Sequence, residues 1–349
     1  MTRAQLPLLL TLAACEPIAD RSGSKHDITM ELDGTTRRMP AEWEPQEAVW
    51  LQWPAEWEGR RVADSFVSII EVVAEYEDVH LLVPDSWEQD RAASKLSHVS
   101  ADRLTIHVVP TNSSWMRDNG PRYVEVDGEL VIQNWEFDGW GGAWGPASLY
   151  VDDNVVPDVV AEMLDLPLEQ VPVVHERGDL EVNGTDTAMV NWSVVSHRNP
   201  GHSKEALTEA FQQALGVDSV IWAEGFDPLD GTRGHIDGMA RFVAEDTILV
   251  GDDGSKLMDD VAAQIQAQRP DLVVDRLVSD NAAQFLNFLV GNGFVLVADS
   301  GSQSENSVAE AVLQDYFPGR DIRFANVDAL WNNGGGIHCV TNDQPVAPE

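Results

Sequence analysis

The sequence predicts a mixed α/β fold, built of repeated modules within a single domain. Short β-branched runs alternate with stretches of helical spacing, and this cadence recurs about every 50 to 70 residues. No linker or low-complexity segment divides residues 38–349, although the total length of 349 residues would allow two domains. With 43% hydrophobic residues the chain can bury a sizeable core, which excludes disordered and collagen-like classes.

The predicted strands are short apolar runs bounded by Asp, Asn, Gly or Pro, and the predicted helices carry apolar residues at helical spacing. Strands are expected at 79–83, 104–109, 247–250 and 293–297, and helices at 62–76, 204–215, 259–268 and 307–317. The copies are too divergent for the pattern alone to give the number of modules.

The first residues have the features of a processing segment. Arg3 precedes a short apolar run, which is far below the roughly 20 residues needed to span a bilayer. Leu12–Cys15 resembles the lipobox of bacterial lipoproteins, which implies a signal peptide over residues 1–14 and acylation of Cys15. Residues 15–37 would then form a flexible tether, and we expect the protein to be exported and lipid-anchored at the outer membrane or cell surface. The alternatives are a mis-assigned start or an ordinary apolar N-terminus.

The charge balance limits the classes of molecule that the protein is expected to bind. There are 22 basic and 59 acidic residues, which gives a net charge of −37. Such a surface repels phosphate backbones and anionic lipids, so nucleic acid is not expected as a partner. It attracts metal ions, amines or guanidinium compounds, although solubility or a saline habitat also explains it. Two cysteines cannot form a disulfide framework, and lipidation of Cys15 would leave Cys339 as a lone, reactive thiol.

Three glycine-flanked polar clusters carry the candidate chemistry. They are Trp115–Pro121, Gly234–Gly238 and Gly334–Thr341. In a strand, His235 and Asp237 would share one face, because side chains alternate with a period of two. Taken singly, each cluster has a structural interpretation: a local salt bridge, a paired histidine, or an inert packed cysteine. Together they are the parts of a cysteine-dependent hydrolase that acts on a cationic carbon.

These motifs make the chain recognisable over residues 38–349. It resembles the family that groups agmatine deiminases with bacterial, Porphyromonas-type peptidylarginine deiminases, within the guanidino-group-modifying superfamily. The matching segments are Met39–Pro45, Trp50–Pro54, Trp115–Pro121, Gly234–Asp237, Arg241–Val243, Asn287–Phe288 and Gly335–Thr341. The resemblance implies a five-bladed α/β propeller (pentein) of ββαβ modules around a substrate tunnel, with no metal or organic cofactor.

Carried over by position, the resemblance makes Cys339 the nucleophile and His235 the general acid/base. Asp118 and Asp237 are expected to hold the guanidinium, which stays charged because its pKa exceeds about 12. Attack by the thiolate, loss of ammonia and hydrolysis of the thiouronium intermediate would give a ureido product. Substrate-binding roles are expected for Trp115 and Asn287, which lie in these motifs, and for Glu176 and Arg177, which lie beside the expected pocket.

Departures from the family pattern leave the substrate open. Arg177 stands where members usually carry glycine, Arg233 replaces a common aspartate, and Asn342–Gln344 differs from the usual glutamine-rich segment. Arg177 could bind a substrate carboxylate, or form a surface salt bridge with Glu176 or Asp179. We expect agmatine, converted to N-carbamoylputrescine, with peptidyl or free arginine as the alternative. A non-catalytic lipoprotein that binds guanidino compounds is the second alternative, and homo-oligomerisation is left open.

Overall fold

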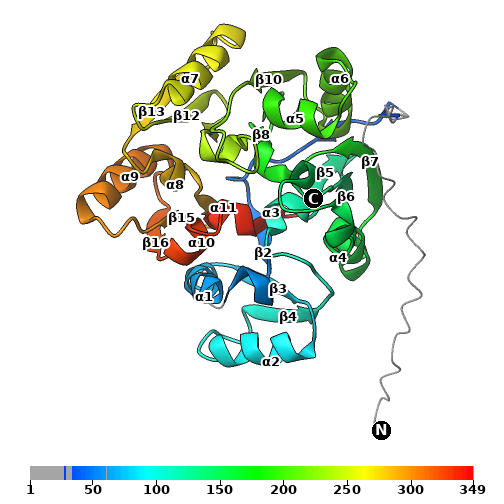
Figure 1. The fold of residues 1–349 in the computed structure, drawn as a ribbon, viewed down its shortest axis with the longest axis vertical. Helices are drawn as coiled ribbons and strands as arrows, with labels where there is room; N and C mark the ends of the chain where they lie inside the picture. Colours follow the sequence, from blue (N-terminus) through cyan, green and yellow to red (C-terminus); the bar gives the residue numbers. More distant parts are fainter. Residues whose placement is uncertain (1–26, 29–33, 60, 349) are drawn as a thin grey trace.

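The computed structural model of the chain describes residues 27–28, 34–59 and 61–348. In this part of the chain the strands form five small sheets of three or four strands. The sheets surround a centre in which two short helices lie, α3 (Met116–Asn119) and α11 (Ile337–Val340) (Figure 1). The predicted mixed α/β fold is confirmed. The lipobox with Cys15, and most of the predicted tether, lie outside the described residues.

One sheet joins the two ends of the described chain. It has the order β17–β2–β3–β4 and consists of β2 (Gln46–Gln52), β3 (Asp78–Val83), β4 (Leu104–Val108) and β17 (Thr341–Pro345). β17 pairs antiparallel with β2, whereas β2, β3 and β4 run parallel and are connected through α1 (Val62–Val73) and α2 (Ser86–Lys95). Trp50 Nε1 on β2 donates a hydrogen bond to Gln344 Oε1 on β17 at 2.8 Å. The last strand thus completes the sheet that the first long strand begins.

The next sheet has the order β1–β5–β6–β7. Its strands are β1 (Arg37–Arg38), β5 (Arg122–Val126), β6 (Glu129–Glu136) and β7 (Leu168–Val174). β5 and β6 form an antiparallel hairpin whose two turn residues, Asp127 and Gly128, have φ of 50° and 88°. An Asp-Gly pair with both φ values positive is the turn that matches the twist of a hairpin. β7 then runs parallel to β6 and is reached through α4 (Val156–Leu164).

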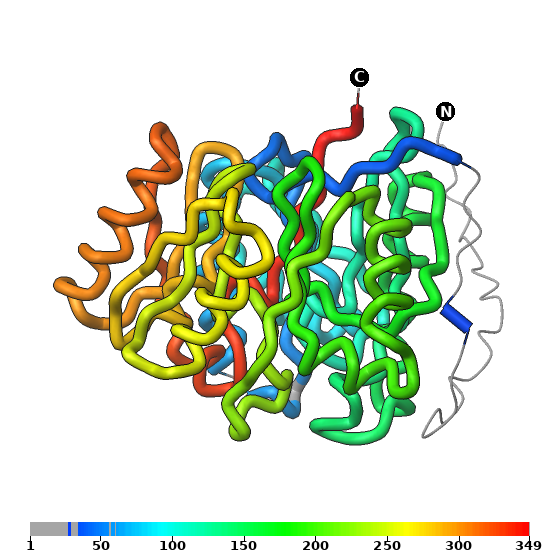
Figure 2. The backbone as a smooth tube through the Cα atoms, turned by 90° about the horizontal axis from the view of Figure 1, so that it is seen from above, coloured from blue at the N-terminus to red at the C-terminus, as the bar shows by residue number. Residues whose placement is uncertain are grey.

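The other three sheets repeat one pattern, in which an antiparallel pair is followed by a parallel strand that is reached through helix. Their strands are β8 (Glu181–Val182), β9 (Thr187–Asn191) and β10 (Ser219–Ala223); β11 (Ala240–Ala244), β12 (Thr247–Asp252) and β13 (Val273–Val278); and β14 (Leu289–Gly291), β15 (Phe294–Ala298) and β16 (Asp321–Ala325). The connecting helices are α5 (Trp192–Arg198), α6 (Lys204–Leu215), α7 (Lys256–Gln268) and α9 (Gln303–Tyr316). The long helices lie at the periphery (Figures 1 and 2).

Apolar side chains fill the space between each sheet and its helices. On α6, Leu207 and Phe211 lie one turn apart and are both fully buried, in the same cluster as Val190 of β9. Burying each such side chain stabilises the fold by about 1.5–3 kcal/mol. The peripheral helices therefore hold the sheets in place, and the inner ends of the sheets remain available for polar residues.

Single helical turns occupy the centre. They are α3, η5 (Arg177–Asp179), η6 (Ile236–Gly238), α8 (Ala282–Leu286) and α11. Among these turns, α3 contacts α11 and η5, and η6 contacts η5 and α8. Further short turns are η1 (Glu56–Glu58), η2 (Trp140–Gly142), η3 (Ala147–Leu149), η4 (Asp153–Val155) and α10 (Asp328–Trp331). In the described part of the chain, no helix is both long and apolar enough to cross a membrane.

The predicted elements are found, with differences at their ends. The helix expected at 204–215 coincides with α6, and the strand expected at 79–83 lies within β3. The helix expected at 259–268 begins earlier, at Lys256, because the side chain of Ser255 caps it by accepting the Met258 N–H. A polar cap lies outside the apolar periodicity from which the helix was predicted, so the pattern alone places the start too late.

Candidate active site

Asp118 is held on α3, the helical turn between β4 and β5. Its Oδ2 accepts a hydrogen bond from Trp140 Nε1 at 2.8 Å, and its Oδ1 accepts one from the Gly178 N–H at 3.2 Å. A Cβ atom at position 178 would lie 2.7 Å from Asp118 Oδ1 and 2.6 Å from His235 Nδ1, so glycine is required for this close approach. Burial raises the pKa of Asp118 to about 6, although the nearby His235 opposes the shift.

His235 immediately precedes η6. The shared face of His235 and Asp237 was predicted for a strand, whereas Ile236–Gly238 forms a 3₁₀ turn. Asp230 orders the loop before this turn, because its carboxylate accepts hydrogen bonds from two backbone N–H groups of that loop at 2.7 and 2.8 Å. The arrangement places His235 Nδ1 3.6 Å from Asp118 Oδ1, and its Nε2 3.4 Å from Glu176 Oε2.

These carboxylates determine the charge of His235. Burial alone would lower the pKa of the imidazole, but Asp118 and Glu176 outweigh burial and raise it to about 10. Burial also opposes ionisation of Glu176, yet Arg198, whose Nε lies 2.8 Å from Glu176 Oε1, and His235 hold the pKa of this carboxyl far below its ordinary value. His235 is therefore an imidazolium at neutral pH and can act as a general acid.

Cys339 lies on α11, two residues before β17 begins at Thr341. Asn287 flanks the sulfur: its Nδ2 lies 3.2 Å from Sγ, and its Oδ1 accepts the Cys339 N–H at 3.3 Å. A Cβ atom at position 335 would lie 3.1 Å from Sγ, so Gly335 leaves one side of the sulfur open.

Asp237, on η6, reaches the same sulfur. Its Oδ2 lies 3.6 Å from Cys339 Sγ. Burial, then the negative charges of Asp237 and Asp118, raise the pKa of the Cys339 thiol well above its ordinary value. The thiol is therefore protonated at neutral pH unless a cation is placed against the two carboxylates, which would reverse their effect.

Two cavities share His235 and Cys339 in their linings. The smaller has a volume of about 110 Å³ and is lined by Asp118 and by aromatic side chains. These aromatic residues are Trp57, Trp115, Trp140, Trp144 and Tyr150. The larger, of about 710 Å³, includes Asp237 and Asn287 in its lining. Because aromatic faces and carboxylates both attract cations, the site suits a small cation that carries an apolar chain.

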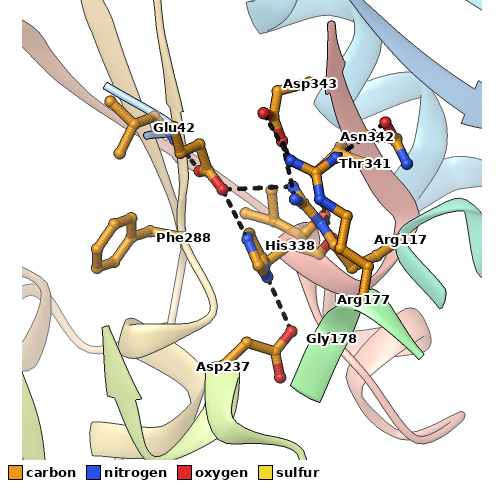
Figure 3. Close-up of polar contacts among 12 residues, drawn as sticks. Glu42, Arg117, Arg177, Gly178, Asp237, Phe288, His338, Thr341, Asn342 and Asp343 are labelled. Atoms are coloured by element: carbon orange, nitrogen blue, oxygen red, sulfur yellow. Dashed lines mark hydrogen bonds and ion pairs between the residues drawn. The ribbon is translucent and has the colours of Figure 1, made fainter. Parts of the chain in front are cut away.

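A chain of ionic contacts connects Asp237, through His338 and Glu42, with Arg117 and Asp343 (Figure 3). His338 Nδ1 is 2.8 Å from Asp237 Oδ2, and His338 Nε2 is 2.7 Å from Glu42 Oε2. Glu42 continues the chain, because its Oε2 lies 3.5 Å from Arg117 Nη2. Arg117 Nη1 in turn lies 2.8 Å from Asp343 Oδ1. The local Arg117–Asp118 salt bridge, which was the structural interpretation of this motif, is therefore replaced by long-range pairs.

Arg177 belongs to this ionic chain and not to the cavity linings. Its Nη2 lies 2.8 Å from both carboxylate oxygens of Asp343, and its Nη1 donates to Asn342 Oδ1 at 3.0 Å. The residue is only 6% exposed, so the alternative prediction, a surface salt bridge with Glu176 or Asp179, is also wrong. Since the guanidinium is already bound within the protein, its position does not support the expected contact with a substrate carboxylate.

The structure gathers most of the predicted site residues. Cys339, His235, Asp118, Trp115, Asp237 and Asn287 line one or both cavities, and Glu176 contacts His235 from behind. His338 and Glu42 were not predicted as site residues, although both lie inside recognised motifs. The contacts of His338 could not be predicted from the motifs, because its partners Asp237 and Glu42 are 101 and 296 positions away in the sequence. Trp140, which comes from η2, was not predicted either. Among the described residues, no group of three or more His, Cys, Asp or Glu side chains is arranged to hold a metal ion.

The sequence and the fold of the chain are similar to those of known deiminases. The model of the Porphyromonas-type peptidyl-arginine deiminase family matches residues 38–345. An agmatine deiminase of Pseudomonas syringae pv. tomato is 28% identical over 361 residues, which cover 88% of this chain and 95% of the relative. The solved agmatine deiminase of Enterococcus faecalis is 25% identical, with a TM-score of 0.80 over 91% of this chain and 99% of the other. An agmatine deiminase of C. jejuni with substrate bound has the same fold, with a TM-score of 0.81 at 19% identity, over 92% of this chain and 100% of the other.

Proposed function

Because the chain belongs to the Porphyromonas-type peptidyl-arginine deiminase family, we propose that it hydrolyses the guanidinium group of agmatine. The products are N-carbamoylputrescine and ammonia. The observation that carries the proposal is the placement of a thiol, an imidazolium and two carboxylates around the two adjoining cavities. The agmatine deiminases that align with most of this chain support the choice of substrate.

The two aspartates bind the substrate. Asp118 and Asp237 accept hydrogen bonds from the planar N–H groups of the guanidinium and orient its carbon toward Cys339 Sγ. The bound cation also offsets the negative charges that hold the thiol in its protonated form, so substrate binding itself promotes the thiolate. The aromatic lining of the smaller cavity, which includes Trp115, packs on the methylene chain of agmatine.

The reaction then proceeds in two halves. The thiolate of Cys339 forms a C–S bond with the guanidinium carbon. The His235 imidazolium donates its proton to the departing nitrogen, so that the C–N bond breaks and ammonia leaves. In the second half, His235 accepts a proton from water, which forms the new C–O bond. The C–S bond breaks, the thiolate is released and the ureido product leaves.

Peptidyl or free arginine is the competing substrate class. Both carry a carboxylate or a backbone amide near the far end of the side chain, which needs a partner that agmatine does not require. Arg177 was the residue expected to provide one, and its guanidinium is held by Asp343. This contact favours agmatine.

We also propose that the five sheets are the blades of a propeller built on ββαβ modules. Its support is the repeated combination of an antiparallel pair and a parallel strand, together with the pairing of β17 with β2 at the two ends of the chain. Attachment to the bacterial envelope through lipidated Cys15 is a separate proposal, supported by the Leu12–Cys15 motif alone. The anchor is tested by partitioning the protein between a detergent phase and an aqueous phase. We expect the wild-type protein in the detergent phase and Cys15→Ala in the aqueous phase. An aqueous wild-type protein that retains Met1 would contradict the anchor.

The substrate proposal is tested by mass spectrometry. The full-length protein is incubated separately with agmatine, free arginine and a peptide that ends in arginine, and each product is identified together with released ammonia. We expect a kcat/KM for agmatine that exceeds the other two by about tenfold or more. Product must vanish in Cys339→Ala. A peptide preferred by the same factor would assign the competing substrate class, and binding of agmatine without product would point to the non-catalytic alternative.

A further inference from the structure

His338 lies between two carboxylates, one on each side of its imidazole ring (Figure 3). Its Nδ1 is 2.8 Å from Asp237 Oδ2, and its Nε2 is 2.7 Å from Glu42 Oε2. The residue is 1% exposed, so water cannot take the place of either partner. Its position is also distinctive, because it directly precedes Cys339 on α11.

Both carboxylates are ionised. Burial would favour the neutral acids, but His338 holds the pKa of Asp237 below its ordinary value, and His338, Arg241 and Arg117 together hold that of Glu42 well below. Glu42 Oε2 lies 3.2 Å from Arg241 Nη2 and 3.5 Å from Arg117 Nη2. An ionised carboxylate can only accept hydrogen bonds, so both ring nitrogens of His338 must donate. An imidazole ring with two N–H groups is the imidazolium cation.

The other charges that face His338 come from the elements packed around α11, and each is paired. Arg117 on α3 donates from Nε to the backbone carbonyl of His338 at 3.0 Å, and its Nη1 lies 2.8 Å from Asp343 Oδ1 on β17. Arg241 on β11 lies 2.6 Å from Glu181 Oε1 on β8. Both arginines are therefore paired with further carboxylates, which leaves His338 as the cation in hydrogen-bond contact with the aspartate that lines the larger cavity.

We propose that His338 is a positioning residue, whose two ring N–H groups, held between two carboxylates, fix Asp237 and balance its charge beside the nucleophile. The same oxygen, Asp237 Oδ2, lies 2.8 Å from the His338 ring and 3.6 Å from Cys339 Sγ. The cation therefore reduces the negative potential at the sulfur, and the hydrogen bond fixes the rotation of the carboxylate. The inference rests on the proposed deimination, in which Asp237 binds the guanidinium.

A charge role and a purely structural role have different consequences. In His338→Gln, a neutral side chain leaves Asp237 unbalanced, so the pKa of the Cys339 thiol rises further, while the pocket becomes more negative and still attracts a guanidinium. We therefore expect kcat at neutral pH to fall by about tenfold or more, KM for agmatine not to rise, and part of the lost kcat to return as the pH is raised. A structural role would raise KM and lower kcat equally at every pH.

The thiol itself provides a readout that needs no turnover. The rate of alkylation of Cys339 by iodoacetamide is measured against pH in the substrate-free, full-length protein, with the modified peptide identified by mass spectrometry. We expect the curve of His338→Gln to lie about one pH unit or more above that of the wild type. The matched control is His80→Gln, which removes a half-buried histidine of β3 and should leave the curve in place. Coinciding curves for His338→Gln and the wild type would overturn the proposal.

A second measurement avoids any variant that fails to fold. In wild-type protein labelled with ¹³C-histidine, nuclear magnetic resonance follows the ring signals of all nine histidines. The signal of His338, assigned through contacts to Cys339 and Val340, should show two protonated ring nitrogens at neutral pH, because each nitrogen faces a carboxylate oxygen. A neutral ring tautomer of His338 at neutral pH would overturn the inference. Because neither measurement uses a substrate, a failure of agmatine turnover in the wild type would instead count against the proposed function.

Discussion

His235 and Asp118 face each other across 3.6 Å, and their mutual influence decides which proton the pocket can supply. The carboxylate holds the imidazole in its charged form, and the imidazole in turn limits how far burial raises the pKa of the carboxyl. Cys339 experiences the opposite field, because the carboxylates keep it neutral. The same carboxylates therefore keep His235 protonated and keep the Cys339 thiol neutral until a cation binds.

The raised pKa of His235 predicts a pH dependence of stability. Its folded-state pKa of about 10 exceeds the ordinary value of 6.5, so the folded state binds the extra proton more tightly. The resulting stabilisation is complete below pH 6.5 and is lost as the pH rises through about 10. We expect the free energy of unfolding in urea to decrease from neutral to alkaline pH, and His235→Gln to remove part of that decrease. His80→Gln is the control, because burial lowers the pKa of His80 to about 4, outside this window. Equal slopes in the wild type and His235→Gln would contradict the assignment.

Asp118→Asn should damage both binding and proton supply. The amide cannot balance a guanidinium, and it no longer supports the positive charge on His235. We expect kcat/KM for agmatine to fall by an amount equivalent to about 2–5 kcal/mol, with the alkaline limb of the pH profile displaced to lower pH. Asp186→Asn, on the turn before β9, serves as a control that keeps normal kinetics. If Asp118→Asn keeps the wild-type profile, the carboxylate is structural.

At the scale of elements, the sequence predicted what is encoded locally. Helix α6 could be bounded in advance because its apolar positions are periodic, Ser203 caps its start, and Gly216 ends it with a φ of 71°. The turn η6 could not, since no periodic pattern marks it and the loop before it is ordered by backbone hydrogen bonds to Asp230. The ion pair between Arg177 and Asp343 could not be predicted either, because its members are 166 positions apart and come from the turn η5 and the strand β17.

We expect the ion pair between Arg177 and Asp343 to couple the stability of η5 to that of β17. Removing either partner leaves a buried charge, so Arg177→Gly and Asp343→Gln should each destabilise the fold by about 3–5 kcal/mol. The double variant should lose less than the sum, with a coupling of about 1–3 kcal/mol in a urea-unfolding cycle. The exposed pair Lys256–Asp260 on α7 is the control, with an expected coupling below about 1 kcal/mol. Additive losses at Arg177 and Asp343 would show that the two elements are not joined through this contact.

At the scale of the whole molecule, the strand pairing that closes the fold also positions the nucleophile. The turn α11, which carries Cys339, passes directly into β17, and β17 pairs with β2 nearly 300 positions earlier. The same strand supplies Asp343 to two arginines. We therefore expect the position of the Cys339 sulfur to depend on the pairing of β17 with β2.

This coupling predicts that the final strand is essential for cooperative folding and not merely for activity. Deleting residues 341–349 removes the antiparallel partner of β2 and the hydrogen bond to the fully buried Trp50 Nε1, and leaves Arg117 and Arg177 without their shared carboxylate. We expect the truncated chain to lose its sharp thermal transition by circular dichroism and the slow hydrogen exchange of the β2 amides. Deleting residues 347–349 alone, which lie beyond β17, is the matched control and should preserve both. A cooperative transition within about 5 °C of the wild type in the longer deletion would show that the other sheets fold without closure.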